Sequence, residues 1–262
     1  MKNKKIEIIL YVIICLLLAN ICWYFTYNYM KETTGVIAMM LGSFIPMILA
    51  LIFIKIFNGN YKELGFRLNI KKSWKIYLLS FIISVLLSYV AVPLMLLMFN
   101  GKVSIGFTQE TFIMLILTPI IGIISSVEMM GEEIGWIGYL YPKLEKNNGT
   151  ILACIILGII RGFYHLGIII VRDFPIHGLI ELTMSNVLLS FMMVYLFKKS
   201  KSLFPVCLLH ILLNLFPIVL VYENSWYYTS IFPMIVSMLP AIIMSLYFIY
   251  LMKKQNLIEL KK

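Results

Sequence analysis

The sequence GEEIGWIGYLYPKL, residues 131–144, decides how this chain folds. It continues an apolar run over 111–127 and places two adjacent carboxylates, Glu132 and Glu133, where hydropathy still predicts the interior of a bilayer. An ionised carboxylate at that depth costs several kcal/mol unless another group pairs with it. We therefore interpret Glu132 and Glu133 as candidate functional residues and expect their partners elsewhere in the membrane.

The composition of the chain predicts an integral membrane protein. Of the 262 residues, 61% are apolar and only 13% are charged, against roughly 25% charged residues in a typical soluble domain. Mean hydropathy is +0.95. The four cysteines lie in apolar stretches without paired spacing, so they predict neither a disulfide framework nor a thiolate zinc site.

About eight apolar runs approach the length needed to cross a bilayer core of roughly 30 Å. Because we find no internal repeat, no low-complexity segment and no separate soluble part, we expect an all-α integral membrane bundle of about eight transmembrane helices, with residues 1–262 as a single polytopic domain. The predicted spans are 6–28, 36–57, 76–99, 111–141, 150–171, 179–197, 203–221 and 229–252.

The basic residues predict the orientation of the bundle. Most of the 22 Lys and Arg residues fall at the N-terminus, in the loops at 55–75, 143–146 and 198–201, and in the C-terminal tail, which eight spans place on one side. The positive-inside rule makes that side cytoplasmic, so both termini of a multi-pass cell-membrane protein are expected there. The net charge of +10 then faces anionic lipid headgroups, and nucleic acid is not an expected partner.

Other strongly polar groups occur at a depth comparable to that of Glu132. Arg161 and His165 lie in the fifth span, and His210 and Asn214 lie in the seventh. At a rise of 1.5 Å per residue, three spans bring acid, imidazole and amide to depths of roughly 14 to 23 Å from the inside end. Each pair is spaced by four residues and so projects from one helix face. We expect these residues to form one site.

Small residues indicate how the spans approach one another. The glycines at 131, 135 and 138 form a smooth stripe beside Glu132, and those at 158 and 162 form a small-xxx-small face before His165. We expect close approach of the fourth and fifth spans to bring Glu132 near His165. Glu128, one turn before Glu132, either contacts the site or lines a water path.

The residue types indicate water-activating chemistry. A desolvated glutamate can take a proton from water, an imidazole can orient that water or bind a metal with it, and a histidine with an asparagine can donate to an oxyanion. Amide hydrolysis needs these three roles. A proton or ion relay would use the same groups, although no inverted repeat or pair of broken half-helices favours a transporter.

Three segments carry a resemblance to a known family. EEIGWIGYLYPKL, RGFYHLG and SLFPVCLLHILLN resemble, in order and spacing, the motifs of the CPBP family of CAAX proteases and bacteriocin-processing or immunity enzymes, also called the Abi family and related to type II CAAX prenyl endopeptidases. The likeness, which includes the KELGFRL loop, covers about 60–220.

The resemblance implies roles for particular residues. Glu132 matches the catalytic glutamate and Glu133 its neighbour, His165 the histidine of the second motif, and His210 and Asn214 the residues of the third. The family implies intramembrane cleavage of a peptide bond, described either as glutamate-type or as metal-dependent. A divalent metal such as zinc would take Glu132, His165 and His210 as ligands, although their spacing carries no metal signature.

The chain departs from the family motifs at two positions. Ile137 stands where the family has an arginine, and Arg161 stands where it has an aromatic residue. Our hypothesis is that Arg161 supplies from another span the cation missing at 137, because a buried glutamate pair needs a counter-charge. The rival interpretation is a site that has drifted away from catalysis.

We therefore predict an intramembrane endopeptidase that hydrolyses a membrane-associated peptide or protein. Its expected substrates include a peptide pheromone, a bacteriocin precursor or a membrane-protein tail. The alternative is a non-catalytic member of the same fold that acts as a bacteriocin immunity protein or as a scaffold for a partner membrane protein.

Overall fold

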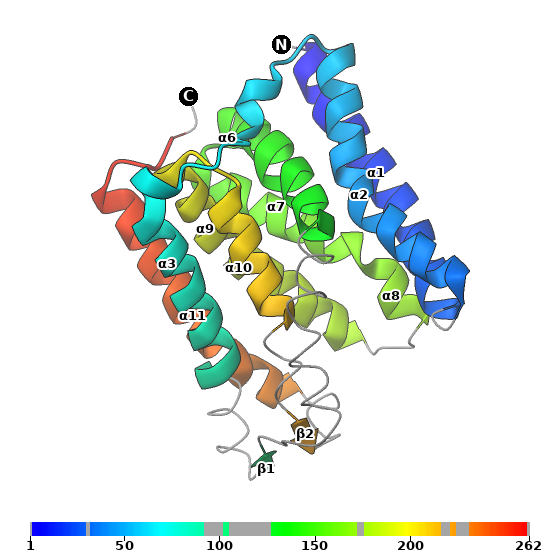
Figure 1. The fold of residues 1–262 in the computed structure, drawn as a ribbon, viewed down its shortest axis with the longest axis vertical. Coiled ribbons are helices and arrows are strands. Elements are labelled where there is room, and N and C mark those ends of the chain that lie inside the picture. The colour runs from blue at the N-terminus through cyan, green and yellow to red at the C-terminus, as the bar shows by residue number, and fades with distance from the viewer. Residues whose placement is uncertain are drawn as a thin grey trace.

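The computed structural model of the chain describes residues 2–29, 32–91, 102–104, 127–171, 176–215, 221–223 and 231–260. These segments form a bundle of helices (Figure 1), as the sequence predicts. Its elements are α1 (Lys2–Asn28), α2 (Thr33–Ile56), the 3-10 turn η1 (Tyr61–Leu64), α3 (Ile70–Val85), the π-helical η2 (Leu86–Ala91), β1 (Lys102–Ser104), the π-helical η3 (Ile134–Leu140), α6 (Tyr141–Asn148), α7 (Thr150–Tyr164), α8 (Leu166–Val171), α9 (Ile176–Ser200), α10 (Phe204–Leu215), β2 (Val221–Glu223) and α11 (Ile231–Lys254).

Four of the described helical segments are long and apolar enough to cross a membrane, namely Lys5–Asn28, Thr33–Ile56, Thr150–Val171 and Gly178–Ser200. A shorter apolar helix covers Phe204–Asn214. Residues 92–101, 105–126 and 216–220, which fall in or beside three predicted spans, lie outside the described residues. The first residue of α1 and the last of α11 lie toward the same end of the bundle (Figure 1). The cytoplasmic placement of that end stays a prediction.

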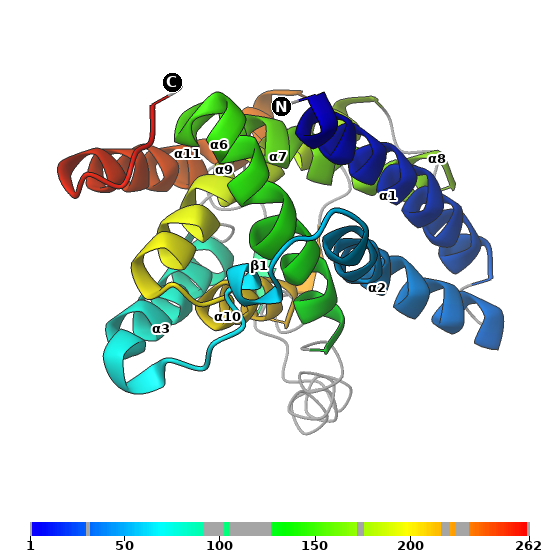
Figure 2. The same cartoon turned by 90° about the horizontal axis from the view of Figure 1, so that it is seen from above.

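The helix that carries the two glutamates runs through the middle of the molecule. Residues 127–133 are α-helical, η3 follows directly, and α6 continues the chain to Asn148. Seen from above (Figure 2), this helix has α1 and α2 on one side and α3 and α9 on the other. Trp136, Ile137 and Leu140 of η3 are completely buried. A site on this central helix is therefore shielded on several sides.

The glycine stripes bring helices together, but not the pair that we expected. A Cβ on Gly131 would lie 2.8 Å from the Phe44 ring of α2, and one on Gly135 would meet Pro46 of the same helix. Cβ atoms on the glycines at 158 and 162 would collide with α9. The glycine faces therefore do not pack the fourth and fifth spans on each other, because Gly131 and Gly135 are covered by α2 and the other pair by α9.

The chain turns sharply between the central helix and α7. Gly149 separates α6 from α7 with φ of 79°, a left-handed value that side-chain-bearing residues rarely adopt. Beside this turn, the Thr150 N–H donates to the Glu259 carbonyl at 2.9 Å, and the Glu259 N–H donates to the Thr150 hydroxyl at 2.8 Å. Lys198 of α9 forms an ion pair with Glu145 at the same place. These contacts fix the start of α7, which carries Arg161 and ends at Tyr164, directly before His165.

Candidate active site

A cavity of about 250 Å³ lies beside the central helix. Four of the predicted site residues line it, and they come from three separate helical segments: Glu132, His165, His210 and Asn214. Glu128 also lines the cavity, as do Trp23 of α1 and Ser43 of α2. A volume of this size holds several water molecules. The polar residues grouped by depth thus line one common space.

Glu132 is buried at the wall of this cavity, with 3% of its surface exposed. Within the described residues it forms no ion pair. Because successive residues of a helix point about 100° apart, the neighbouring Glu133 is directed elsewhere. Of the two adjacent glutamates, Glu132 is therefore the one placed to meet a molecule in the cavity.

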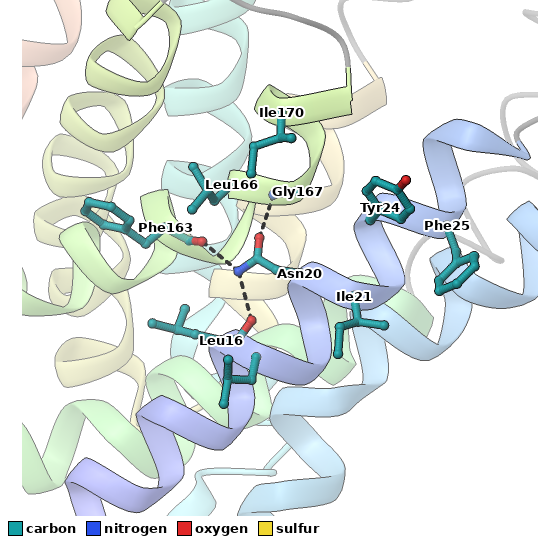
Figure 3. A pocket seen from close by; sticks show the side chains of 10 residues that line it. Leu16, Asn20, Ile21, Tyr24, Phe25, Phe163, Leu166, Gly167 and Ile170 are labelled. Atoms are coloured by element: carbon teal, nitrogen blue, oxygen red, sulfur yellow. Dashed lines mark hydrogen bonds between the residues drawn. The ribbon is translucent and has the colours of Figure 1, made fainter.

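His165 occupies a break between two helices. It follows the last residue of α7, has φ of −100° and ψ of 15°, and precedes α8. Its ring packs against Trp23 and Tyr164, at centroid distances of 5.2 and 4.7 Å. Its Nδ1 is buried and has no hydrogen-bond partner among the described residues. The backbone on either side of this break is bound by a side chain of α1, as Figure 3 shows.

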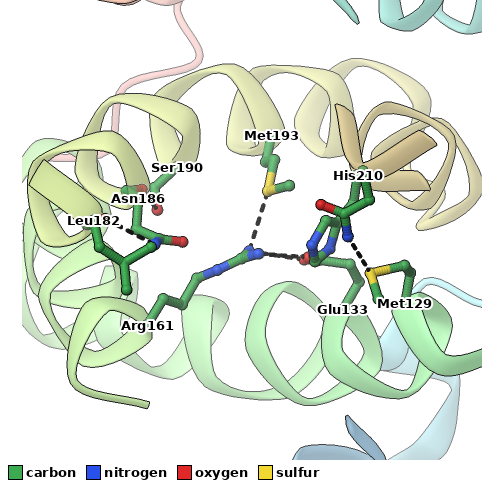
Figure 4. A network of polar contacts seen from close by, with 9 residues as sticks. Met129, Glu133, Arg161, Leu182, Asn186, Ser190, Met193 and His210 are labelled. Atoms are coloured by element: carbon green, nitrogen blue, oxygen red, sulfur yellow. Dashed lines mark hydrogen bonds and ion pairs between the residues drawn. The ribbon is translucent and has the colours of Figure 1, made fainter. Parts of the chain in front are cut away.

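Glu133 points into the packed interior, where it meets Arg161 and His210 (Figure 4). The guanidinium of Arg161 donates to both carboxylate oxygens, Nη2 to Oε1 at 2.8 Å and Nη1 to Oε2 at 3.1 Å. Nη1 also lies 3.1 Å from the thioether sulfur of Met193 on α9. Two parallel N–H···O bonds are the strongest geometry for such an ion pair. The predicted pairing of Arg161 with a glutamate is therefore present, and Glu133 is the partner.

The second contact of Glu133 orients a cavity residue, His210. His210 Nδ1 lies 2.7 Å from Glu133 Oε1. An ionised carboxylate only accepts hydrogen bonds, so Nδ1 carries a proton. The other ring nitrogen, Nε2, then donates when the ring is an imidazolium and accepts when it is neutral. Glu133 thus orients a histidine that lines the cavity.

Asn214 lies one helical turn after His210 on α10 and lines the same cavity. Its Nδ2 lies 3.1 Å from the sulfur of Met129 on the central helix. A thioether is a weak acceptor, so this contact holds the amide without competing strongly with a better acceptor. A developing oxyanion in the cavity would be such an acceptor.

The donor arrangement does not form a ready metal site. Among the residues that the structure describes, no group of three or more His, Cys, Asp or Glu side chains is gathered closely enough to hold a metal ion. Glu132, His165 and His210, the set considered for zinc, line one cavity without forming such a group. We therefore derive no step through a metal.

Several residues of the site were not predicted from the sequence. Trp23 packs on the His165 ring, Met193 contacts Arg161, and Met129 contacts Asn214. A tryptophan or methionine in an apolar span carries no signal that separates it from the core. Asn20 does carry one, because it is an amide within an otherwise apolar run.

The fold and the cavity define a helical membrane protein with a buried carboxylate and imidazole site. Residues 108–216 match the family model described as type II CAAX prenyl endopeptidase Rce1-like. This match contains all three motifs and confirms the resemblance to the CAAX proteases over those residues. No curated protein matches the chain significantly.

Proposed function

We propose that this protein is an intramembrane endopeptidase that hydrolyses a peptide bond by glutamate-activated water. One observation carries the proposal: Glu132, His165, His210 and Asn214 line a single cavity of about 250 Å³. The match to an endopeptidase family supports the same reaction class. No soluble domain is needed for this chemistry, because all four groups come from the helices of the bundle.

The proposed reaction starts with water held between Glu132 and His165. Glu132 takes a proton from this water as its oxygen attacks the peptide carbonyl carbon. The carbonyl oxygen becomes an oxyanion, which accepts hydrogen bonds from His210 Nε2–H and Asn214 Nδ2–H. The carbon–nitrogen bond then breaks, and the proton held by Glu132 passes to the leaving amine. The hydroxyl group of the water thus ends in the new carboxyl group, and its other proton ends on the new amine.

The Glu133 and Arg161 pair acts on this reaction through His210. By accepting from Nδ1–H, Glu133 stabilises an imidazolium, whose Nε2 then carries the proton that an oxyanion needs. Arg161 balances the carboxylate charge in the dry interior. In this proposal Arg161 and Glu133 are positioning residues, and Arg161 takes the place of the family arginine that is missing at Ile137.

The proposed substrate is a peptide or the tail of a membrane protein in a cell membrane, with both termini of this chain in the cytoplasm. A cavity of about 250 Å³ is far smaller than a folded domain, so an extended segment is the form of substrate that we propose. A second candidate is a non-catalytic immunity protein or a scaffold for a membrane protein. One observation favours that candidate: of the two positions that depart from the family motifs, Arg161 pairs with Glu133, which also contacts the cavity residue His210.

The test compares secreted and membrane peptides by mass spectrometry. Cells carry the wild-type protein, Glu132→Gln, His165→Ala or no protein, at matched membrane levels. Glu63→Gln is the control, because Glu63 is an exposed residue of η1. A fragment made only by the wild type and the control supports the protease. Indistinguishable peptides, with a deletion phenotype rescued by both site variants, would identify the scaffold instead.

A further inference from the structure

The helix α1 lies outside the segment matched by the family model, yet it reaches the candidate site. It packs along both α2 and α8. Trp23 of α1 contacts the ring of His165, and Asn20, one turn earlier, contacts the backbone beside that residue. Two neighbouring positions of α1 thus converge on one histidine.

The break at His165 leaves backbone groups that helical hydrogen bonds do not satisfy. At a helix end the last carbonyls have no partner four residues on. The His165 N–H instead donates to the Gly162 carbonyl at 3.2 Å. In a membrane such groups must find partners within the protein, because the lipid core supplies none.

Asn20 supplies partners on both sides of the break (Figure 3). Its Nδ2 donates to the Phe163 carbonyl at 3.0 Å, and its Oδ1 accepts from the Gly167 N–H at 2.6 Å. The same Nδ2 also lies 2.8 Å from the Leu16 carbonyl of its own helix. One amide therefore spans the two residues that flank the break, and His165 stands between them.

The surroundings of Asn20 are mostly apolar. The amide lies in a groove of about 520 Å³ between α1 and α8, and its other lining residues are mostly aliphatic or aromatic (Figure 3). The close approach also depends on Gly167, where a Cβ would lie 2.6 Å from the Asn20 carbonyl oxygen. A side chain without an amide at position 20 would leave two backbone groups facing apolar surroundings.

We propose that Asn20 is a positioning residue for His165, holding the broken helix so that the imidazole stays at the cavity wall. The inference rests on the proposed function in one respect, namely that His165 serves the reaction. The geometric part, that Asn20 sets the placement of the His165 ring, stands apart from catalysis. The proposal also makes α1 a part of the site, although the family match covers only residues 108–216.

The experiment uses the full chain in phospholipid nanodiscs with isotopically labelled histidine. The chain has only three histidines, so the ring-nitrogen signals of His165 and His210 can be assigned from His165→Gln and His210→Gln. The test variant is Asn20→Leu, which keeps the approximate volume. The matched control is Asn28→Leu on the same helix, because among the described residues the Asn28 amide donates to Tyr24 of that helix and not to the backbone near His165.

We expect Asn20→Leu to move the His165 signals and to leave those of His210 in place, whereas Asn28→Leu moves neither. On a substrate found by the peptide comparison, kcat should fall on the order of 100-fold while KM changes little. Unmoved His165 signals would overturn the inference, as would equal movement of both histidines. If Asn20→Leu does not fold, Asn20→Ser, whose shorter side chain cannot span both backbone groups, is measured the same way.

A failure of the proposed function gives a different result. If the wild type cleaves nothing, the protease proposal fails, but the histidine signals still decide whether Asn20 places His165. If the wild type cleaves and Asn20→Leu retains both its kcat and its His165 signals, the protease stands and the role of Asn20 is refuted.

Discussion

Removing Arg161 should leave Glu133 as an uncompensated charge in the interior. The Glu133 side chain is 0% exposed and that of Arg161 is 4% exposed, and they share two hydrogen bonds at 2.8 and 3.1 Å. Breaking a buried pair by removing one partner typically costs about 3–5 kcal/mol. His210 still contacts Glu133, so we expect Arg161→Leu to lower the free energy of unfolding by about 3 kcal/mol, the lower end of that range.

The assay is reversible unfolding in mixed micelles, followed by circular dichroism. Arg67→Leu is the control, because Arg67 is exposed in the loop before α3. Replacing both partners, as Arg161→Leu with Glu133→Met, should recover most of the lost stability, because no charge then remains unpaired. The charge argument is refuted if Arg161→Leu costs less than about 1 kcal/mol, or if the double variant is no more stable than Arg161→Leu alone.

The loss caused by Arg161→Leu should be partly reversed by a second substitution, Ile137→Arg, which returns a cation to Glu133. Ile137 follows Glu133 by four residues on the central helix, which places it within reach of the carboxylate. We expect Ile137→Arg to restore part of the stability of Arg161→Leu, and any cleavage activity with it. No recovery, with both variants folded, would argue against a compensated change and for a site that has lost its role.

Three further results should follow. Glu132→Gln should lower cleavage by about 10²–10⁴-fold and leave stability unchanged, whereas a large loss of stability would make Glu132 structural; Glu63→Gln is the matched control. Gly158→Ala should cost about 1–3 kcal/mol of unfolding free energy, because its Cβ would collide with Val187, whereas Gly59→Ala meets only ordinary contacts and should cost less. Dialysis against a strong chelator should leave the cleavage rate unchanged if water is activated by glutamate; a loss reversed by added zinc would show that a metal is required.

Depth and spacing along the sequence were enough to group four of the polar residues that share the cavity. A charged or polar side chain inside a membrane needs a polar partner at the same depth. We could therefore group Glu132, His165, His210 and Asn214 by their distance from the loops. The same reasoning paired Arg161 with the glutamates. It could not choose between Glu132 and Glu133, because that choice depends on the direction of each side chain about the helix axis.

Other features depend on contacts that spacing does not encode. A glycine face indicates that something packs closely there, but Gly158 and Gly162 meet α9 instead of the central helix. The sequence around His165 contains no proline that would predict the break between α7 and α8. It is held by Asn20, which is more than a hundred residues away along the chain, and no local pattern could have predicted that contact.

The two adjacent glutamates have different roles in the proposed site. The Glu133 carboxylate accepts from Arg161 on both oxygens and from His210 on one, so its oxygens are already occupied by protein donors. Glu132 lines the cavity without an ion pair among the described residues. One carboxylate cannot both anchor a histidine and take a proton from water, because the contacts that anchor it also stabilise its charge. Consecutive positions on a helix solve this by sending one carboxylate into the packed interior and the other to the cavity.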